Sequence, residues 1–369
     1  MAWLHRIRDY RNRRVADPAF RRWAARFPLT RFVARRQAKA LFDLTAGFVY
    51  SQILAACVKV DLFTVLDERP ASAEAIAART GLSDDGALRL LKAAAAIDLV
   101  EARGGDLFAL GPLGAALVGN DGVTAMIRHH AILYDDLRDP LALLGGKAQP
   151  QLQRYWAYAG GGSSTAPSAR HRHSDYTALM GASQAFIADE ILGAYPFASH
   201  RKLLDIGGGD ASFILTAAKH APQLELSVFD LPPVAAIARE RILAAGLAGR
   251  ARAFGGSFFD DPLPLGADLM TLNRVLHDHD DAAALAILKA ARKAIAPDGT
   301  LLVAEPMAGT KGALASGDAY FGFYLLAMGQ GRPRTEKEIA AMARRAGFSK
   351  ARPLATATPM IARVLALTP

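Results

Sequence analysis

From residue 202 onwards, the sequence alternates short apolar runs with stretches of helical periodicity. The apolar runs are KLLDI, ELSVFD, ARAFGG, ADLMTL and TLLVAE, which begin at residues 202, 225, 251, 267 and 300. Short apolar runs separated by helices are typical of parallel strands that are covered on both faces. This part of the chain is therefore predicted to be a doubly wound α/β sheet. A helix over 335–346 and two strands near 350–354 and 360–366 complete it.

A glycine-rich turn follows the first of these strands. The sequence LLDIGGGD contains Asp205 in the strand and then Gly207, Gly208 and Gly209. Glycines permit a tight turn and a close approach of the backbone to a ligand before the next helix begins. Asp230 ends the second strand, where its carboxylate can accept hydrogen bonds from both ribose hydroxyls of a nucleoside. The third glycine of the dinucleotide pattern would fall on Ser212, and no phosphate-loop lysine is present, so an NAD or phosphate cradle is disfavoured.

Further polar side chains follow the later strands, at the carboxyl edge where open α/β sheets bind their ligands. The expected site residues are Leu231 after the second strand, Gly256, Ser257 and Phe258 after the third, Arg274, His277 and Asp278 after the fourth, and Glu305 at the end of the fifth. Ser257 offers a hydroxyl and Phe258 an aromatic face of a size to cover adenine. Asp278 and Asp280 could instead merely cap the helix that follows them.

The first half of the chain is predicted to be mainly helical. Residues 41–66 are apolar over nearly every face of a helix, so they are buried on all sides or shared with a second subunit. A helix that begins at Ser72, a turn at 81–83, a helix over 84–97 and a hairpin over 99–110 make a winged-helix-like module. Its second helix offers only Arg89 and Lys92 to phosphates, which favours a packing role over reading DNA.

Three domains follow from this organisation. They are a basic amphipathic segment over 1–40, a winged-helix-like dimerisation domain with a helical linker over 41–185, and a ligand-binding α/β domain over 186–369. Within the linker, the composition of residues 160–168 (GGGSSTAPS) suits a mobile loop.

The positive charge of the chain belongs to its first forty residues. The net charge is +9, yet residues 1–40 hold 12 Lys and Arg against 2 Asp, which leaves 32 basic and 33 acidic residues in the remainder. Arginines alternate there with aromatic and aliphatic side chains. Such a segment can lie at an anionic membrane surface, bind nucleic acid, or pack on the rest of the protein with its arginines in water. Neither a secretory signal nor an unbroken run of about 18 apolar residues occurs, so a cytoplasmic protein is expected.

Two other groups of reactive residues are interpreted as structural. Cys57 lies in an apolar helical pattern and is expected to be a small core residue. His129 and His130 have no third ligand at metal spacing, so they are expected to lie in the core or line a pocket, and no metal site is predicted.

Taken in order, these motifs resemble the small-molecule O-methyltransferases that include the plant caffeate and the acetylserotonin enzymes. The resemblance covers residues 41–366 and rests on D-x-G-G-G, VFDLP, GGSFFDDPLP, RVLHDHDD, PDGTLLVAEPM and RTEKEIAAMARRAGF. It implies a Rossmann-like class I methyltransferase domain preceded by a helical, winged-helix dimerisation domain. It also implies a homodimer and S-adenosylmethionine as the cofactor, converted to S-adenosylhomocysteine, without a metal.

The resemblance also implies roles for individual residues. His277 matches the general base of the family, and Glu305 matches the acid that orients it. Arg274, Asp230 and the glycines match the cofactor contacts. Three departures stand out: Ser257 replaces an aspartate that contacts adenine, His279 replaces a tryptophan, and Pro333 with Arg334 replaces a second acidic partner of the base. Glu305 is therefore expected to act alone or with Asp278.

The first forty residues, FDLTAGFVYSQ and RVLHDHDD are similar to the bacterial carotenoid branch of the family, the hydroxyneurosporene and demethylspheroidene O-methyltransferases. This similarity implies methylation of the tertiary 1-hydroxyl of an acyclic carotenoid, with residues 1–40 at the inner photosynthetic membrane and no nucleic-acid partner. Within enzymes, the alternative is a methyltransferase for a phenol or polyketide. Among proteins that are not enzymes, the alternative is a winged-helix regulator that senses S-adenosylmethionine.

Overall fold

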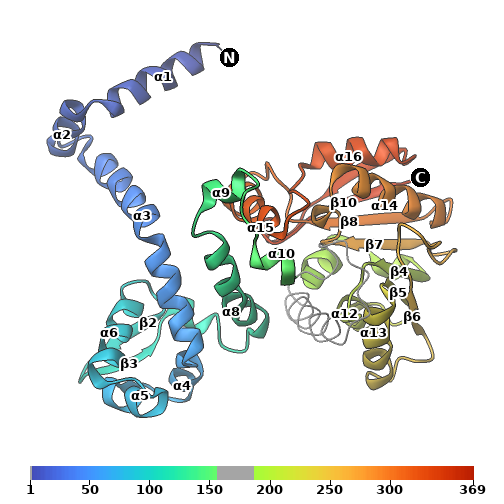
Figure 1. Ribbon diagram of the computed structural model, residues 1–369, viewed down its shortest axis with the longest axis horizontal. Coiled ribbons are helices and arrows are strands. Elements are labelled where there is room, and N and C mark those ends of the chain that lie inside the picture. The colour runs from blue at the N-terminus through green and yellow to red at the C-terminus, as the bar shows by residue number, and fades with distance from the viewer. Residues whose placement is uncertain (1, 156–186) are drawn as a thin grey trace. The chain divides into compact units, whose positions relative to one another are not determined.

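The computed structural model describes residues 2–155 and 187–369, which form two compact units, Met1–Val118 and Gly119–Pro369 (Figure 1). The loop expected at 160–168 and the domain boundary expected after residue 185 lie outside the described residues. Each unit is considered on its own.

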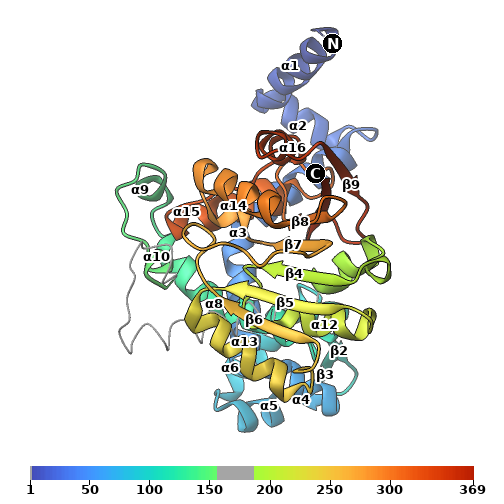
Figure 2. The same ribbon diagram turned by 90° about the vertical axis from the view of Figure 1, so that its right-hand side faces the viewer.

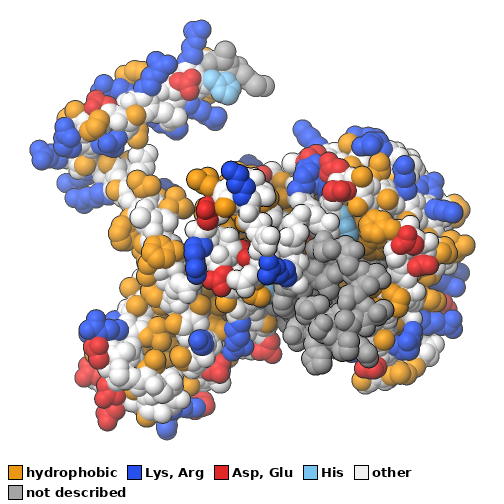
Figure 3. Space-filling view, viewed as in Figure 1, with side chains coloured by type: hydrophobic (Ala, Val, Ile, Leu, Met, Phe, Trp, Pro, Cys, Tyr) orange, Lys and Arg blue, Asp and Glu red, His pale blue; other side chains and the backbone are white. Residues whose placement is uncertain are grey.

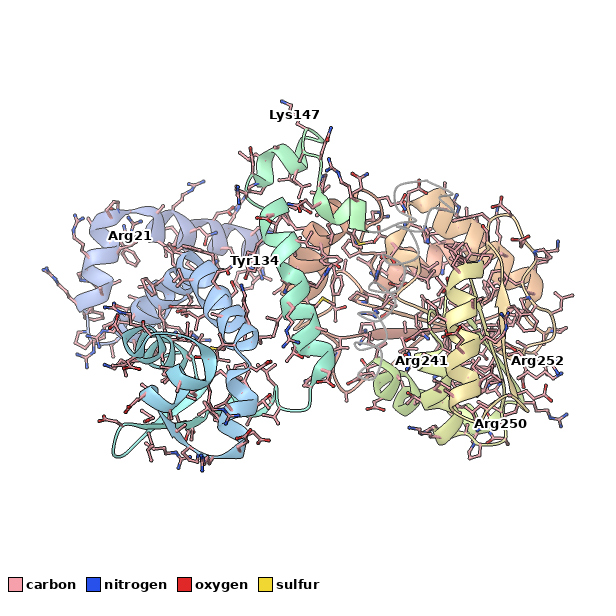
Figure 4. All side chains as sticks on the ribbon, turned by 60° about the horizontal axis from the view of Figure 1, so that its bottom comes forward. Arg21, Tyr134, Lys147, Arg241, Arg250 and Arg252 are labelled. Atoms are coloured by element: carbon pink, nitrogen blue, oxygen red, sulfur yellow. The ribbon has the colours of Figure 1, made fainter. Side chains whose placement is uncertain are left out.

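The first unit opens with three helices, α1 (Ala2–Ala16), α2 (Pro18–Arg26) and α3 (Arg31–Lys59). The carboxylate of Asp17 caps α2, and Arg21 of α2 donates to the last carbonyls of α1 (Figure 4). No glycine or proline interrupts residues 31–46, so α3 runs through the boundary expected between residues 40 and 41. The basic segment and the apolar segment therefore share one helix.

The apolar pattern suggested a single helix through residue 66, but α3 ends at Lys59. Asp61 adopts a left-handed conformation with φ of 50° and separates α3 from α4 (Leu62–Glu68). Within α3 only Cys57 and Val58 are buried, and Cys57 is a core residue as expected. Among the described residues, α3 alone is long and apolar enough to cross a membrane by length and composition. Its most apolar 18-residue window has a mean hydropathy of 1.5 and is 11% buried.

The remainder of the first unit confirms the helix, turn, helix and hairpin pattern. The elements are β1 (Ala71–Ser72), α5 (Ala73–Thr80), α6 (Asp84–Ala95), β2 (Val100–Arg103), β3 (Leu107–Leu110) and α7 (Pro112–Ala115). Ser72 and Ser83 cap α5 and α6 with their hydroxyls. The strands pair antiparallel in the order β1-β3-β2.

The second unit contains a seven-stranded sheet in the order β6-β5-β4-β7-β8-β10-β9. Its strands are β4 (Lys202–Ile206), β5 (Glu225–Asp230), β6 (Ala251–Gly255), β7 (Leu269–Asn273), β8 (Thr300–Glu305), β9 (Lys350–Leu354) and β10 (Arg363–Thr368). Strands β4 to β8 are parallel, whereas β10 runs antiparallel to both β8 and β9. The strand order reverses between β4 and β7, which is where such sheets bind ligands.

Helices cover both faces of this sheet (Figure 2). Buried side chains of α12 (Ser212–His220) and α13 (Pro232–Ala244) share one core with Leu203 and Val228. Those of α14 (Asp281–Ala294) and α16 (Glu336–Arg345) share the other with Leu204 and Ile206. Alternate residues of β4 therefore serve opposite cores, which confirms the doubly wound α/β fold.

The other described elements of this unit are α8 (Asp121–Asp136), α9 (Pro140–Leu144), α10 (Gln151–Tyr155), α15 (Phe321–Met328) and the short turns η1 (Phe197–Ser199), η2 (Leu276–Asp278) and η3 (Ala315–Tyr320). Apolar side chains of α8, α9 and α15 form a third core. The last strand begins at Arg363, three residues later than expected, because a turn occupies the residues before it.

Candidate active site

The turn after β4 has the geometry that its glycines predicted. Gly207 and Gly209 have φ of 69° and 58°, in the left-handed region that favours glycine. A Cβ on Gly208 would come 2.6 Å from Oδ2 of Asp205. The backbone at Gly208 therefore lies so close to Asp205 that only glycine fits there. This places the N–H groups of the turn at the start of α12, next to the sheet edge.

Asp230 at the end of β5 faces this turn. Its carboxylate accepts hydrogen bonds from the backbone N–H of Gly209 at 2.8 Å and of Leu231 at 2.7 Å. Burial raises the pKa of Asp230 to about 6, although these two N–H groups lower it. Further donors, such as ribose hydroxyls, would favour the charged carboxylate.

Asp205 lies beneath the turn and is fully buried. Its Oδ1 accepts from the Thr271 hydroxyl at 2.6 Å and the Asn273 amide at 3.0 Å, both on β7. Its Oδ2 is buried and has no hydrogen-bond partner among the described residues. Burial raises the pKa of Asp205 to about 7. Asp205 thus ties β4 to β7 next to the expected cofactor turn.

The loop after β6 brings the expected adenine-side residues next to Asp230. The N–H of Gly256 donates to the backbone carbonyl of Asp230 at 2.9 Å. The Ser257 hydroxyl accepts from the N–H of Phe259 at 3.2 Å. The ring of Phe258 meets the ring of His279 edge to face, with 5.5 Å between centroids. An aromatic corner, with His279 where the family has tryptophan, therefore adjoins the Asp230 end of the crevice.

His277 lies between two carboxylates in the loop that joins β7 to α14. Its Nδ1 is 2.5 Å from Oε2 of Glu305, and its Nε2 is 3.1 Å from Oδ1 of Asp278. All three side chains are buried. The second oxygen of Glu305 accepts the N–H groups of Val275 at 3.1 Å and Leu276 at 2.8 Å. Glu305 therefore fixes both the imidazole and the backbone that carries it.

The charges around His277 make its imidazole a strong proton acceptor. Burial by itself lowers the pKa of His277, but the Glu305 carboxylate and then Asp278 outweigh burial and raise the pKa to about 10. The neutral form of this imidazole is a stronger base than a free imidazole, but only the small fraction that is neutral near pH 7 can accept a proton.

Arg274 begins the same loop in an unusual conformation. Its φ is 56°, and its N–H donates to the carbonyl of Ala304 at 2.8 Å, one residue before Glu305. Burial raises the pKa of the Tyr320 hydroxyl, and the cation of Arg274 partly offsets that rise. The left-handed backbone turns the chain sharply away from β7, so that His277 comes to lie over the end of β8.

Sequence reasoning missed an aromatic wall beside His277. The ring of Phe321 lies 5.8 Å from that of His277 and 4.9 Å from that of Tyr320. Behind the wall, His130 is 2.7 Å from the Tyr320 hydroxyl and His129 is 2.9 Å from the hydroxyl of Tyr324. The two histidines thus have tyrosine partners, and among residues 2–155 and 187–369 no group of three metal-ligating side chains occurs. The run FGFYLL has no periodic signal that separates wall from core.

Sequence reasoning also missed the role of Arg334, a buried cation that donates to the backbone around His277. From the sequence, Arg334 was named only as part of the motif RTEKEI and beside the place of the lost acidic partner. Because a backbone contact leaves no pattern in the sequence, only the fold reveals it.

The residues at the sheet edge fit a nucleoside-bearing cofactor. Asp230 presents a partly buried carboxylate, the space where a Cβ of Gly209 would lie is open, and the Phe258 corner offers an apolar surface for a base. Arg241 of α13 forms an ion pair with Asp210 at the end of the turn (Figure 4). This pair balances the charge of the Asp210 carboxylate.

Comparison with known proteins points to one family of enzymes. A family model for an O-methyltransferase domain matches residues 134–349, and one for an O-methyltransferase dimerisation domain matches residues 42–120. Demethylspheroidene O-methyltransferase of Cereibacter sphaeroides is 41% identical over 328 residues, which cover 89% of this chain and 86% of the relative.

Two solved structures are also similar. The mitomycin 7-O-methyltransferase has a TM-score of 0.70 and 27% identity, and the match covers 91% of this chain and 99% of that one. Human N-acetylserotonin methyltransferase, solved in complex with SAM, has a TM-score of 0.71 and 22% identity, with 90% and 97% covered. At that identity the second similarity concerns the fold alone.

Proposed function

Because this chain belongs to the O-methyltransferase family whose members join a dimerisation domain to a methyltransferase domain, we propose that it methylates the tertiary 1-hydroxyl of an acyclic carotenoid, with S-adenosylmethionine as the methyl donor. The observation that carries the proposal is the pairing of His277 with Glu305 and Asp278 beside the glycine turn. The 41% identity to a demethylspheroidene O-methyltransferase supports the carotenoid as acceptor.

Each group has a defined task in this reaction. Asp230, the turn over 207–209 and the loop over 256–258 would hold the donor, together with Arg274. When bound, S-adenosylmethionine supplies a methyl group on a sulfonium, which is a good leaving group. Nδ1 of His277 pairs with Glu305, and Nε2 pairs with Asp278 at 3.1 Å, so the acceptor hydroxyl takes the place of Asp278 at Nε2 and gives its proton to that atom while the new C–O bond forms. Glu305 and Asp278 stabilise the resulting imidazolium.

An aliphatic acceptor demands a stronger base than a phenol does. A tertiary alcohol is far less acidic than a phenol, so its proton must leave as the methyl group transfers. Two carboxylates at one imidazole supply that basicity. The aromatic wall of Tyr320, Phe321 and Tyr324 gives an apolar surface on which one end of a polyene can lie.

A carotenoid resides in the membrane, and the first two helices suit contact with an anionic lipid surface. Trp3, Leu4, Ile7 and Tyr10 of α1 are all exposed and recur at helical spacing on one side. Trp23 of α2 and Phe27, which follows the helix, stack with 4.9 Å between centroids and are also exposed. Figure 3 shows basic side chains interleaved with apolar ones along both helices. Rings at headgroup level with arginines toward lipid phosphates would place the enzyme peripherally on the cytoplasmic side of the membrane.

The exposed apolar face of α3 suits a second copy of the chain. Leu41, Phe42, Leu44 and Phe48 are each more than 60% exposed, and the dimerisation-domain match begins at residue 42. Large apolar side chains at this density are typical of an interface. A homodimer built on α3 would cover them.

The proposed activity is tested with a labelled donor and a panel of acceptors. The full-length protein is incubated with S-(methyl-labelled)-adenosylmethionine and either hydroxylated acyclic carotenoids in vesicles or soluble phenols, and products are identified by mass. Labelled 1-methoxy carotenoid is the expected product. Transfer to phenols alone would replace the carotenoid with a phenolic acceptor. No transfer, together with salt-sensitive DNA binding, would favour a regulator instead.

A further inference from the structure

The loop that carries His277 has little structure of its own. Between the left-handed Arg274 and the N-cap of α14 at Asp280, only the single short turn η2 is regular. An irregular loop satisfies few of its backbone groups internally, so its conformation depends on outside partners. The position of the imidazole is therefore set by whatever binds the N–H and C=O groups of residues 275–279.

The N–H side of this loop is bound by an anion and the C=O side by a cation. Glu305 accepts the N–H groups of Val275 and Leu276. On the opposite side, Arg334 donates from Nη1 to the carbonyl of Leu276 at 2.6 Å and from Nη2 to that of His279 at 2.7 Å. These two carbonyls flank His277 in sequence. The loop is thus held between opposite charges, each used on backbone groups.

Arg334 is committed to this loop and the start of the next helix. Its side chain is about 1% exposed, and its Nε and Nη2 also donate to Oδ1 of Asp281, at 3.0 and 2.8 Å. Burying a guanidinium is costly unless its donors are paired, and within the described part of the chain the hydrogen-bond partners of this guanidinium lie in residues 276–281. An arginine at the protein surface could anchor α14 through Asp281 alone. We therefore attribute the burial of the Arg334 guanidinium to its bonds with the carbonyls of Leu276 and His279.

The backbone beside Arg334 contributes a third contact of the same kind. The N–H of Arg332 donates to the carbonyl of His277 itself at 2.9 Å. Gly331 has φ of 85°, and a Cβ there would overlap that carbonyl oxygen. Only a glycine therefore lets the segment 331–334 pass close enough for Arg332 and Arg334 to reach the loop.

We propose that Arg334 is a positioning residue for His277, which sets the imidazole against Glu305 by binding the carbonyls on either side of it. This inference rests on the proposed function only in taking His277 as the base. In related enzymes this segment is expected to supply a second acidic partner of the base, but here Pro333 occupies that place. The segment 331–334 instead contacts the backbone around His277. Without the clamp, the loop relaxes and Nδ1 moves away from the Glu305 carboxylate.

The test compares Arg334→Met with Arg334→Lys and with the control Arg292→Met. Arg292 is matched because it also donates to a backbone carbonyl, that of Gly347, but lies on α14 away from the site. Arg334→Met is expected to lower kcat at least tenfold while the Kd for S-adenosylmethionine stays within twofold, since a misplaced base slows chemistry without removing donor contacts. Arg334→Lys should recover part of the loss, and Arg292→Met should behave as the parent.

Two readouts separate positioning from a merely structural role. In protein labelled with ¹⁵N-histidine, the His277 resonance, identified by its absence in His277→Gln, should titrate at lower pH in Gly331→Ala than in the parent, because the imidazole moves from Glu305 while the Arg334 cation is kept. In Arg334→Met the loss of the cation by itself favours the imidazolium and opposes this shift, so the sign is determined in Gly331→Ala. If Arg334→Met fails to fold, Gly331→Ala carries the test.

The outcomes are distinct. A titration of His277 that is unchanged in folded Gly331→Ala would overturn the clamp, as would a kcat for Arg334→Met within twofold of the parent. A parent protein without methyl transfer to any acceptor would overturn the proposed function, yet the titration would still decide the clamp.

Discussion

Nδ1 of His277 lies 2.5 Å from the Glu305 carboxylate, whose other oxygen binds the backbone just before the histidine. One acid thereby orients the base, raises its proton affinity and fixes its loop. Nε2 lies 3.1 Å from the Asp278 carboxylate, so an acceptor hydroxyl has to take the place of that carboxylate to reach Nε2. A change of pH, or of either carboxylate, should therefore act on methyl transfer through this one nitrogen.

Methyl transfer should depend on pH through His277. The base acts when neutral, and its pKa is raised to about 10, so the neutral fraction grows about tenfold per pH unit below that value. The kcat for a carotenoid acceptor should therefore increase from pH 7 to pH 9 with a slope near one in a logarithmic plot. A rate that is flat over this range would show that His277 is already neutral.

Glu305→Gln should shift that profile to lower pH. The amide can still accept the N–H groups of Val275 and Leu276, but it removes the carboxylate that raises the pKa of His277 most. The midpoint of the kcat profile should fall, and the limiting rate on an alkaline plateau should fall with it because the base is weaker. Asp278→Asn should shift the midpoint in the same direction, because Asp278 also raises the pKa of His277. Equal midpoints in Glu305→Gln and the parent would contradict the assigned role of Glu305.

The prediction from sequence placed the strands well because each is a short apolar run between helices. The runs at Lys202 and Thr300 match the strands β4 and β8 residue for residue. The sequence also located His277, Glu305 and Asp230, since each lies at a strand end or just beyond it. It left open whether Glu305 acts alone or with Asp278; the geometry places both carboxylates at the ring, which favours the second alternative.

What could not be predicted depends on contacts between distant segments. The clamp of Arg334 on the His277 loop joins residues 55 or more positions apart through backbone carbonyls, and carbonyls are the same in every residue. The continuity of α3 across residue 40 was hidden because the charge pattern changes there while the helix propensity does not. The wall at Phe321 looked like any apolar helix.

Asp230→Asn should weaken binding of S-adenosylmethionine by about tenfold to a hundredfold, because hydrogen bonds to a charged group contribute about 1.5–3 kcal/mol. The two oxygens of Asp230 accept the N–H groups of Gly209 and Leu231, one each. An asparagine has only one oxygen, so its NH₂ group would face one of these two N–H groups. The Kd is measured by titration calorimetry. Asp268→Asn is the matched control, since Asp268 accepts the N–H groups of Arg201 and Lys202 at the opposite end of β4. Equal Kd values for the two variants would remove Asp230 from the donor site.

Charge reversal in α2 should detach the protein from anionic vesicles. Arg22 and Arg26 are exposed on α2, and each basic residue near an anionic surface contributes about 1 kcal/mol. Arg22→Glu combined with Arg26→Glu should reduce co-sedimentation with phosphatidylglycerol vesicles, and salt at roughly 0.5 M should reduce it for the parent by screening the same charges. The same double reversal at Arg344 and Arg345 of α16 is the control. Equal losses from both pairs would indicate a response to net charge alone.

A charge on the exposed face of α3 should prevent dimer formation. Phe48→Asp would bury an unpaired carboxylate if α3 forms the interface, which is strongly unfavourable. Sedimentation velocity should show a dimer for the parent and a monomer for the variant at micromolar concentration. Leu243→Asp, on a comparably exposed apolar position of α13, should remain a dimer. A dimeric Phe48→Asp would place the interface elsewhere.

If His277 removes the proton of the acceptor hydroxyl, His277→Gln should methylate the carotenoid far more slowly than the parent. Glutamine keeps a polar group of similar size but cannot accept a proton, so kcat should fall about 10²- to 10⁴-fold, the usual contribution of a general base, while S-adenosylmethionine binds as tightly as before. A His277→Gln enzyme that methylates the 1-hydroxy carotenoid at the parent rate, with donor binding intact, would contradict the account.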